Sequence, residues 1–109
     1  MKTHLARDLT ELESQLSSLG ELVIDSVQCA IDAIGSFDLE KVARIGENEK
    51  RINEMEISIE QNCLKIIALH QPVATDLRFL IVVLKVNNDL ERIADQAVNI
   101  GARIELLYD

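Results

Sequence analysis

The sequence contains few of the residues that interrupt helices or favour strands. Its 109 residues include one proline and four glycines, the two residue types that most strongly mark turns. Two phenylalanines, one tyrosine and no tryptophan leave it short of the aromatic side chains enriched in strands. Leu, Ile, Glu, Ala and Val dominate instead, and this composition favours helices. The sequence therefore predicts an all-α protein, and its length predicts a single domain over residues 1–109.

A surplus of basic residues is also missing. The formal net charge is −8, which argues against a nucleic-acid partner and against binding to a bare anionic membrane. The most apolar run, residues 79–84, is far too short to span a bilayer, and residues 1–13 contain no apolar signal core. We therefore expect a cytoplasmic protein.

The sequence motifs of common enzymes and disulfide scaffolds are absent. Cys29 and Cys63 form no CxxC pair and have no neighbouring histidine, so we interpret them as reduced core residues. There is no glycine-rich phosphate loop, no GxSxG and no Cys/His arrangement. The sequence therefore predicts that the protein is not an enzyme.

Apolar residues recur at spacings of three and four along three segments, which is the helical period. The predicted helices span residues 3–34, 38–69 and about 72–108. Because the connections between them are short, we expect an antiparallel, up-down-up three-helix bundle.

The two connections contain recognisable end signals. Gly35 is the predicted left-handed residue after the first helix, and Ser36 or Asp38 is the predicted N-cap of the second. Pro72 suits the first position of the third helix, where a missing backbone N–H costs nothing. Proline also disfavours the α conformation in the residue before it, so Gln71 is expected to lie between the two helices.

The third helix contains two apolar lines on nearly opposite faces. One is continuous, and we interpret it as the packing seam: Val83, Val86, Leu90, Ile93, Ala97, Ile100, Ile104 and Leu107. The other is apolar at both ends but polar in the middle: Leu77, Ile81, Leu84, Asn88, Glu91, Asp95, Ala102 and Leu106. This polar interruption is the candidate functional region.

Four oxygen-bearing side chains are predicted to meet at that region. If the second and third helices fold back around Gln71, Glu49 lies level with Arg92, and residues four apart share a helix face. The predicted metal ligands are Glu49, Asn53, Glu91 and Asp95. Oxygen donors without Cys or His suit Mg²⁺, Ca²⁺, Mn²⁺ or ferric iron, and suit zinc less well. The alternative is that these carboxylates are solvated and neutralised by neighbouring basic side chains.

Two stretches of the sequence resemble the signature of the PhoU family: QPVATDLR at residues 71–78 and LKVNNDLERIADQAVNI at residues 84–100. The resemblance extends upstream to EMEISIEQNCLKIIALHQP at residues 54–72. It implies an all-helical protein built from two three-helix repeats, of which this chain covers one. Either the chain is a piece of a two-repeat protein or it is a single-repeat protein that self-associates, and either arrangement would cover residues 79–84.

The resemblance also implies a site and a function. Proteins of this family bind iron or zinc clusters through E(D)xxxD motifs, which correspond here to Glu91 with Asp95 and to Glu49 with Asn53. Asn53 stands where the motif prefers Asp and would be a weaker, neutral ligand. The family regulates phosphate uptake negatively, by coupling the Pst ABC transporter ATPase to the PhoR-type sensor kinase, and reaches the membrane only through these partners. A metal-controlled helical bundle and a purely structural helical module are the alternative functions.

Overall fold

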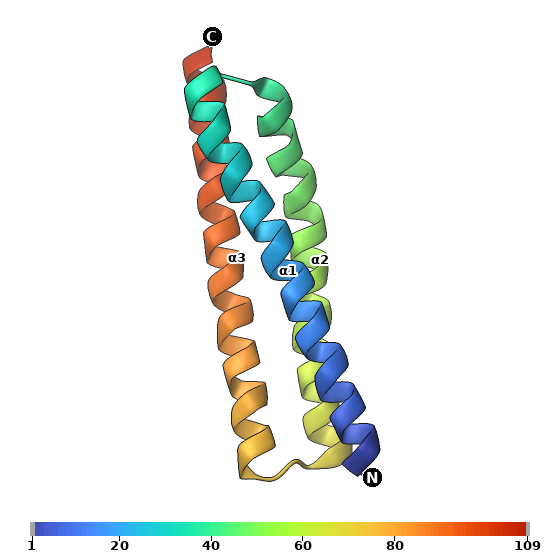
Figure 1. The fold of residues 1–109 in the computed structure, drawn as a ribbon. Helices are drawn as coiled ribbons and strands as arrows, with labels where there is room; N and C mark the ends of the chain where they lie inside the picture. The colour runs from blue at the N-terminus through green and yellow to red at the C-terminus, as the bar shows by residue number, and fades with distance from the viewer. Residues whose placement is uncertain (1, 109) are drawn as a thin grey trace.

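The computed structural model describes residues 2–108, and their side chains from residue 4 onward. It consists of three long helices, α1 (Lys2–Ser36), α2 (Leu39–His70) and α3 (Ala74–Tyr108). They run up, down and up beside one another in a rod of 58 × 17 × 17 Å (Figure 1). The predicted all-α, antiparallel three-helix bundle is therefore confirmed, and each observed helix end lies within two residues of the predicted one.

The first connection differs from the prediction at one residue. The α1 helix continues through Gly35, and Phe37 adopts the left-handed conformation instead, with φ 54°. The backbone N–H of Phe37 donates to the Ala33 carbonyl at 2.7 Å, which closes the end of the helix. Asp38 follows as the N-cap of α2, so Phe37 is the residue at which the chain leaves α1.

Asp38 is the N-cap of α2, as one of the two predicted alternatives states. Its side-chain oxygen accepts a hydrogen bond from the Glu40 N–H at 2.9 Å, which satisfies a backbone donor at the helix start. The hydroxyl of Ser36, the other alternative, donates back to the Asp32 carbonyl at 2.9 Å. Ser36 therefore belongs to the end of α1.

The second connection is slightly longer than predicted. Gln71 adopts a left-handed conformation with φ 44°, and its N–H donates to the Ile67 carbonyl at 3.1 Å. Pro72 follows outside both helices, and α3 begins at Ala74 rather than at the proline. This extra length shifts the register of α3 against α2.

The core runs along the axis of the bundle and is built mainly from aliphatic side chains of all three helices. On α3, however, the predicted packing seam is wrong in part, because Ile93 is 46% exposed and Leu107 is 74% exposed. The buried line on α3 consists of Leu80, Val83, Asn87, Ala94, Ala97, Gly101 and Ile104.

Small residues on this line let the helices approach closely. A Cβ atom added to Gly101 would lie 3.4 Å from Val42 Cγ1 on α2. Ala94 and Ala97, which are also small, occupy the same buried line. Within residues 79–84, Ile81 and Val82 are 43% and 55% exposed in the single chain, and their cover by a second repeat or a second copy stays a prediction. Within the described residues, no helix is long and apolar enough to cross a membrane.

Candidate functional site

The structure places the four predicted metal ligands on the two expected helices. Glu49 and Asn53 belong to α2, and Glu91 and Asp95 belong to α3. Glu49 and Glu91 are partly buried, whereas Asn53 and Asp95 are exposed. Among the described residues, no three His, Cys, Asp or Glu side chains form a group that could hold a metal ion. The metal site stays a prediction.

The register between α2 and α3 differs from the predicted one. The Asn87 side-chain amide donates to the Glu56 carbonyl at 3.0 Å, which fixes the level of the two helices. Two helical turns away, Glu49 lies level with Ala94, whereas the prediction placed it level with Arg92. The predicted register is therefore wrong by about two residues, because the connection is longer than expected.

A different glutamate of α2 meets the polar region of α3. The carboxyl group of Glu56 lies against that of Glu91 on α3, and the charges of Glu60 and Asp95 lie close by. Burial, followed by the hydrogen bond to Glu91, raises the pKa of Glu56 from 4.5 to about 7. Near neutral pH, a substantial fraction of the Glu56 carboxyl is therefore protonated. The sequence contained a signal for it, since Glu56 and Glu60 are four residues apart on one face.

Asn87 is a second functional candidate that the sequence analysis did not single out. Its side chain is buried, with 2% of its surface exposed, and its Nδ2 donates to the Glu56 carbonyl. Its Oδ1 is buried without a hydrogen-bond partner. Leaving a buried acceptor unpaired costs about 1–3 kcal/mol. We call Glu56, Glu60, Asn87, Glu91 and Asp95 the α2–α3 cluster, which combines four carboxyl groups with an unpaired amide oxygen.

A contrasting polar cluster lies between α1 and α2. Asn48 Nδ2 donates to Asp25 Oδ2 at 2.8 Å and to Ser26 Oγ at 3.0 Å. The other carboxylate oxygen of Asp25 accepts from Arg44 Nη2 at 2.8 Å. We call these four residues the α1–α2 cluster. Ser26 and Asn48 are buried at 1% and 6% exposure, so their pairing removes the cost of burying them.

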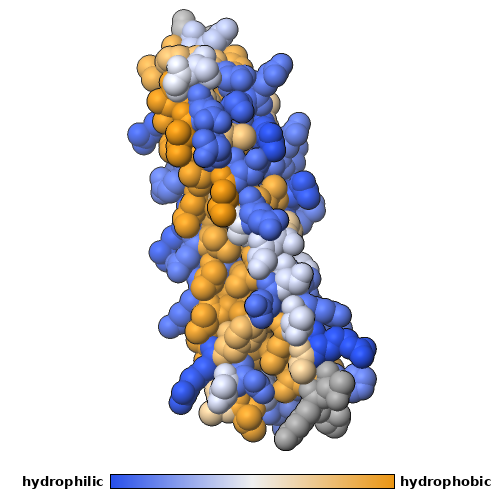
Figure 2. Space-filling view, in the orientation of Figure 1, coloured by the Kyte–Doolittle hydropathy of each residue, from blue (hydrophilic) through white to orange (hydrophobic). Residues whose placement is uncertain are grey.

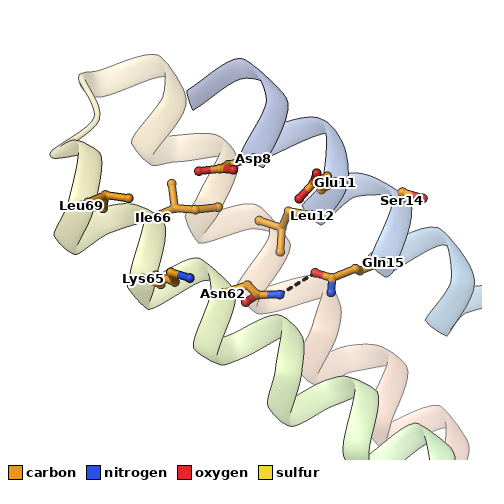
Figure 3. A pocket seen from close by; sticks show the side chains of 9 residues that line it. All are labelled: Asp8, Glu11, Leu12, Ser14, Gln15, Asn62, Lys65, Ile66 and Leu69. Carbon is orange, nitrogen blue, oxygen red and sulfur yellow. Dashed lines mark hydrogen bonds between the residues drawn. The ribbon is translucent and has the colours of Figure 1, made fainter. Parts of the chain in front are cut away.

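A groove also lies between the first part of α1 and the last part of α2 (Figure 3). Leu12, Ile66 and Leu69 line it together with polar side chains from both helices, around a volume of about 410 Å³. Asn62 donates to Gln15 Oε1 across the helices at 2.8 Å (Figure 3). Because this hydrogen bond joins α1 to α2, we interpret the groove as part of the packing between the two helices rather than as a binding site.

Comparison with known proteins gives a consistent result. The PhoU domain model matches residues 16–104. The chain is 42% identical to the phosphate-specific transport system accessory protein PhoU homolog of Burkholderia sp, over 86% of this chain and 40% of that protein. It is 34% identical to the homolog of Aquifex aeolicus, over 96% of the chain and 48% of that protein.

A third relative is the phosphate-specific transport system accessory protein PhoU of Escherichia coli, which is 37% identical over 83% of the chain and 37% of that protein. The chain thus spans less than half the length of these curated relatives. No solved structure matches it.

Proposed function

The chain belongs to the PhoU domain family, and from this premise we propose that it is a non-enzymatic adaptor of phosphate uptake and phosphate-starvation signalling. In this role it contacts the ATPase of a Pst-type phosphate ABC transporter and a PhoR-type sensor kinase, and couples them negatively. The observation that supports the proposal is the PhoU-domain match over residues 16–104, with relatives whose names describe accessory proteins of phosphate-specific transport.

The shape and charge of the molecule suit an adaptor. A rod 58 Å long presents separate surfaces along its length, so two partners can be contacted without displacing each other. The net charge of −8 favours partners with basic contact surfaces, whose attraction would raise the association rate and weaken with added salt.

Binding to purified partners tests this function. The immobilised chain is incubated with the transporter ATPase and, separately, with the cytoplasmic part of the sensor kinase, at low and at high salt. We expect retention of at least one partner, and less retention at high salt. Retention of neither partner by bait whose circular dichroism shows intact helices would contradict the proposal.

Cation binding at the α2–α3 cluster is the second candidate function, in which the cation would control assembly or partner binding. The proximity of the Glu56 and Glu91 carboxyl groups supports it, because a bound cation would relieve the repulsion between them. The predicted ligands Glu49, Asn53, Glu91 and Asp95 remain the proposed set, with Glu56 as an added α2 ligand. Iron or zinc is the expected metal, and Mg²⁺ or Mn²⁺ also suits oxygen donors.

Metal analysis separates this function from the first. The wild type and the variant Glu91→Gln/Asp95→Asn are purified without chelator and dialysed against Fe²⁺, Zn²⁺ or Mn²⁺. The metal content of each protein is then measured. The matched control, Asp89→Asn/Glu105→Gln, removes the same charge from exposed positions of the same helix. We expect loss of bound metal only in the first variant. Equal, negligible metal in the wild type and both variants would rule the function out.

A second pair of variants identifies the ligands on α2. Glu49→Gln/Asn53→Ala removes the set expected from the family motif, and Glu56→Gln removes the residue that contacts Glu91. A larger fall in metal content for Glu56→Gln would assign the α2 ligand to Glu56. A larger fall for the other variant would favour the motif residues.

A further inference from the structure

Both histidines of the chain lie at one end of the bundle, where α1 begins and α2 ends (Figure 1). His4 belongs to the first turn of α1, and His70 is the last residue of α2. Together with Arg7, Asp8 and Leu69 they line a pocket with a volume of about 310 Å³. The sequence contains no other histidine, so every imidazole group of the protein borders this pocket.

A short contact joins the two helices at the pocket. His70 Nε2 lies 2.9 Å from Asp8 Oδ2, and the His70 side chain is only 8% exposed. Imidazole nitrogen and carboxylate oxygen are both common ligands of zinc. A cation is also favoured beside the last turn of α2, because the negative end of the helix dipole lies there. Two potential ligands from different helices are therefore already in contact.

His4 supplies a third potential ligand from α1. It stands four residues before Asp8, and residues four apart share a helix face. As the structure stands, these three side chains do not form a group that could hold a metal ion, so His4 has to turn toward the other two. Its side chain is exposed and can change rotamer without disturbing the packing of the bundle.

The contact between His70 and Asp8 suits zinc after a small adjustment. Bonds of about 2.0–2.2 Å in a tetrahedral zinc site hold neighbouring ligand atoms roughly 3.4 Å apart. The observed 2.9 Å therefore has to open by about 0.5 Å to admit the ion. Two imidazole nitrogens and one carboxylate oxygen leave the fourth position to water. A ligand set with two nitrogens favours zinc over Mg²⁺ or Ca²⁺, which prefer oxygen.

The charges around the pocket are mixed, but their balance favours a cation. Arg7 lines the pocket and Lys65 lines the neighbouring groove of Figure 3, and both oppose a bound cation. Both side chains are exposed, so solvent and salt screen their charges. Asp8 and Glu11 border the same groove, and the chain as a whole has a net charge of −8. Figure 2 shows hydrophilic residues beside the start of α1, at the edge of an apolar stripe that follows most of the molecule.

We propose that His4, Asp8 and His70 form a zinc site that joins the first turns of α1 to the end of α2. His4 and Asp8 hold the ion from α1, and His70 holds it from α2. Zinc stabilises the folded chain in this way, because the unfolded chain does not keep the three ligands together. The inference rests neither on phosphate regulation nor on cation binding at the α2–α3 cluster, which contains no histidine.

Titration with Zn²⁺, followed by NMR of the histidine side chains, tests the site. The chain is used without an affinity tag, so its two imidazole groups report on this pocket and on no other cation site. We expect the signals of both groups to change together and to reach their final positions at one equivalent of zinc. The same change is expected in Glu91→Gln/Asp95→Asn, which removes carboxylates from the α2–α3 cluster alone.

Variants on α1 separate ligation from general charge. Asp8→Asn exchanges the carboxylate for a neutral amide, and we expect the dissociation constant for zinc to rise on the order of tenfold or more. The matched control Glu13→Gln removes the same charge from an exposed position of α1 outside the pocket and should leave the constant nearly unchanged. His4→Gln alters only an exposed side chain, so it keeps the fold and should also weaken zinc binding. Circular dichroism verifies the helix content of each variant.

Three results would overturn the proposal. The first is no change in either imidazole group up to near-millimolar zinc. The second is a change confined to one histidine, which would show that the two helices do not share the ion. The third is equal weakening by Asp8→Asn and Glu13→Gln, which would assign zinc binding to the overall negative charge of the chain.

Discussion

Two polar clusters interrupt the apolar core of this bundle, and they differ in how their polar atoms are paired. In the α1–α2 cluster, a buried amide, a hydroxyl and a carboxylate satisfy one another, and Arg44 neutralises Asp25. In the α2–α3 cluster, Glu56 meets another carboxyl group and the Oδ1 of Asn87 has no partner. The first arrangement specifies how two helices pack. The second brings like charges together and leaves a buried acceptor unpaired, and both features cost stability.

Breaking the paired cluster should have the largest effect. Asn48→Ala removes the donor to both Asp25 and Ser26 and leaves the Ser26 hydroxyl buried. We expect the free energy of unfolding to fall by about 2 kcal/mol, measured by urea denaturation at neutral pH. The double variant Ser26→Ala/Asn48→Ala should lose less than the sum of the single changes, because the two residues share one interaction. Strict additivity would show that they do not.

Removing the carboxyl contact should produce a smaller, pH-dependent effect. The pKa of Glu56 is raised in the folded state, so folding favours its protonated form, and the resulting destabilisation grows as the pH rises from 4.5 to about 7. Glu56→Gln should therefore stabilise the protein at pH 8 by about 1 kcal/mol, allowing for solvent screening, and have little effect near pH 4. Urea denaturation at both pH values measures this difference. An equal effect at both pH values would contradict the raised pKa of Glu56.

Replacing the unpaired amide should sharpen the comparison further. Asn87→Leu keeps a similar volume and removes a buried acceptor without a partner, at the expense of one hydrogen bond to the Glu56 carbonyl. We expect the free energy of unfolding to rise by about 0.5 kcal/mol. Asn48→Leu, by contrast, should lower the free energy of unfolding, because it removes an amide that is fully paired. A loss above about 1 kcal/mol for Asn87→Leu would mean that Oδ1 is satisfied in solution.

The smallest effect is expected at the predicted α2 ligands. Asn53 is exposed and Glu49 is only partly buried, so Glu49→Gln/Asn53→Ala should change the metal-free stability by less than about 0.5 kcal/mol. Thermal unfolding in the presence of chelator provides the measurement. A larger loss would assign these residues a packing role.

Much of the fold could be predicted from the sequence because its signals are local. The apolar period defines the three helices, Asp38 provides an N-cap, and the single proline separates α2 from α3. The α3 core line was harder to predict, because Ala94 and Gly101 stand out little in a hydrophobic pattern. Their small size matters only once another helix lies against them.

The site could be predicted only in part, because it depends on the alignment of two helices. Glu91 and Asp95 were identified from the interruption of an apolar line, and the structure places both near Glu56. Glu56 itself was missed, because the conformation of Gln71 lengthens the connection and moves the register by about two residues. A shift of that size changes which side chains meet between helices.

The close approach at Gly101 has a mechanical consequence for the α2–α3 cluster. Glu91 lies ten residues before Gly101 on the same unbroken helix, or about 15 Å away along its axis. An alanine Cβ at position 101 would make ordinary van der Waals contact with Val42 at 3.4 Å, whereas a longer side chain would have to displace α2 or α3. Because α3 is continuous between the two positions, a bulky residue at position 101 is expected to move Glu91 relative to Glu56 without contacting either of them.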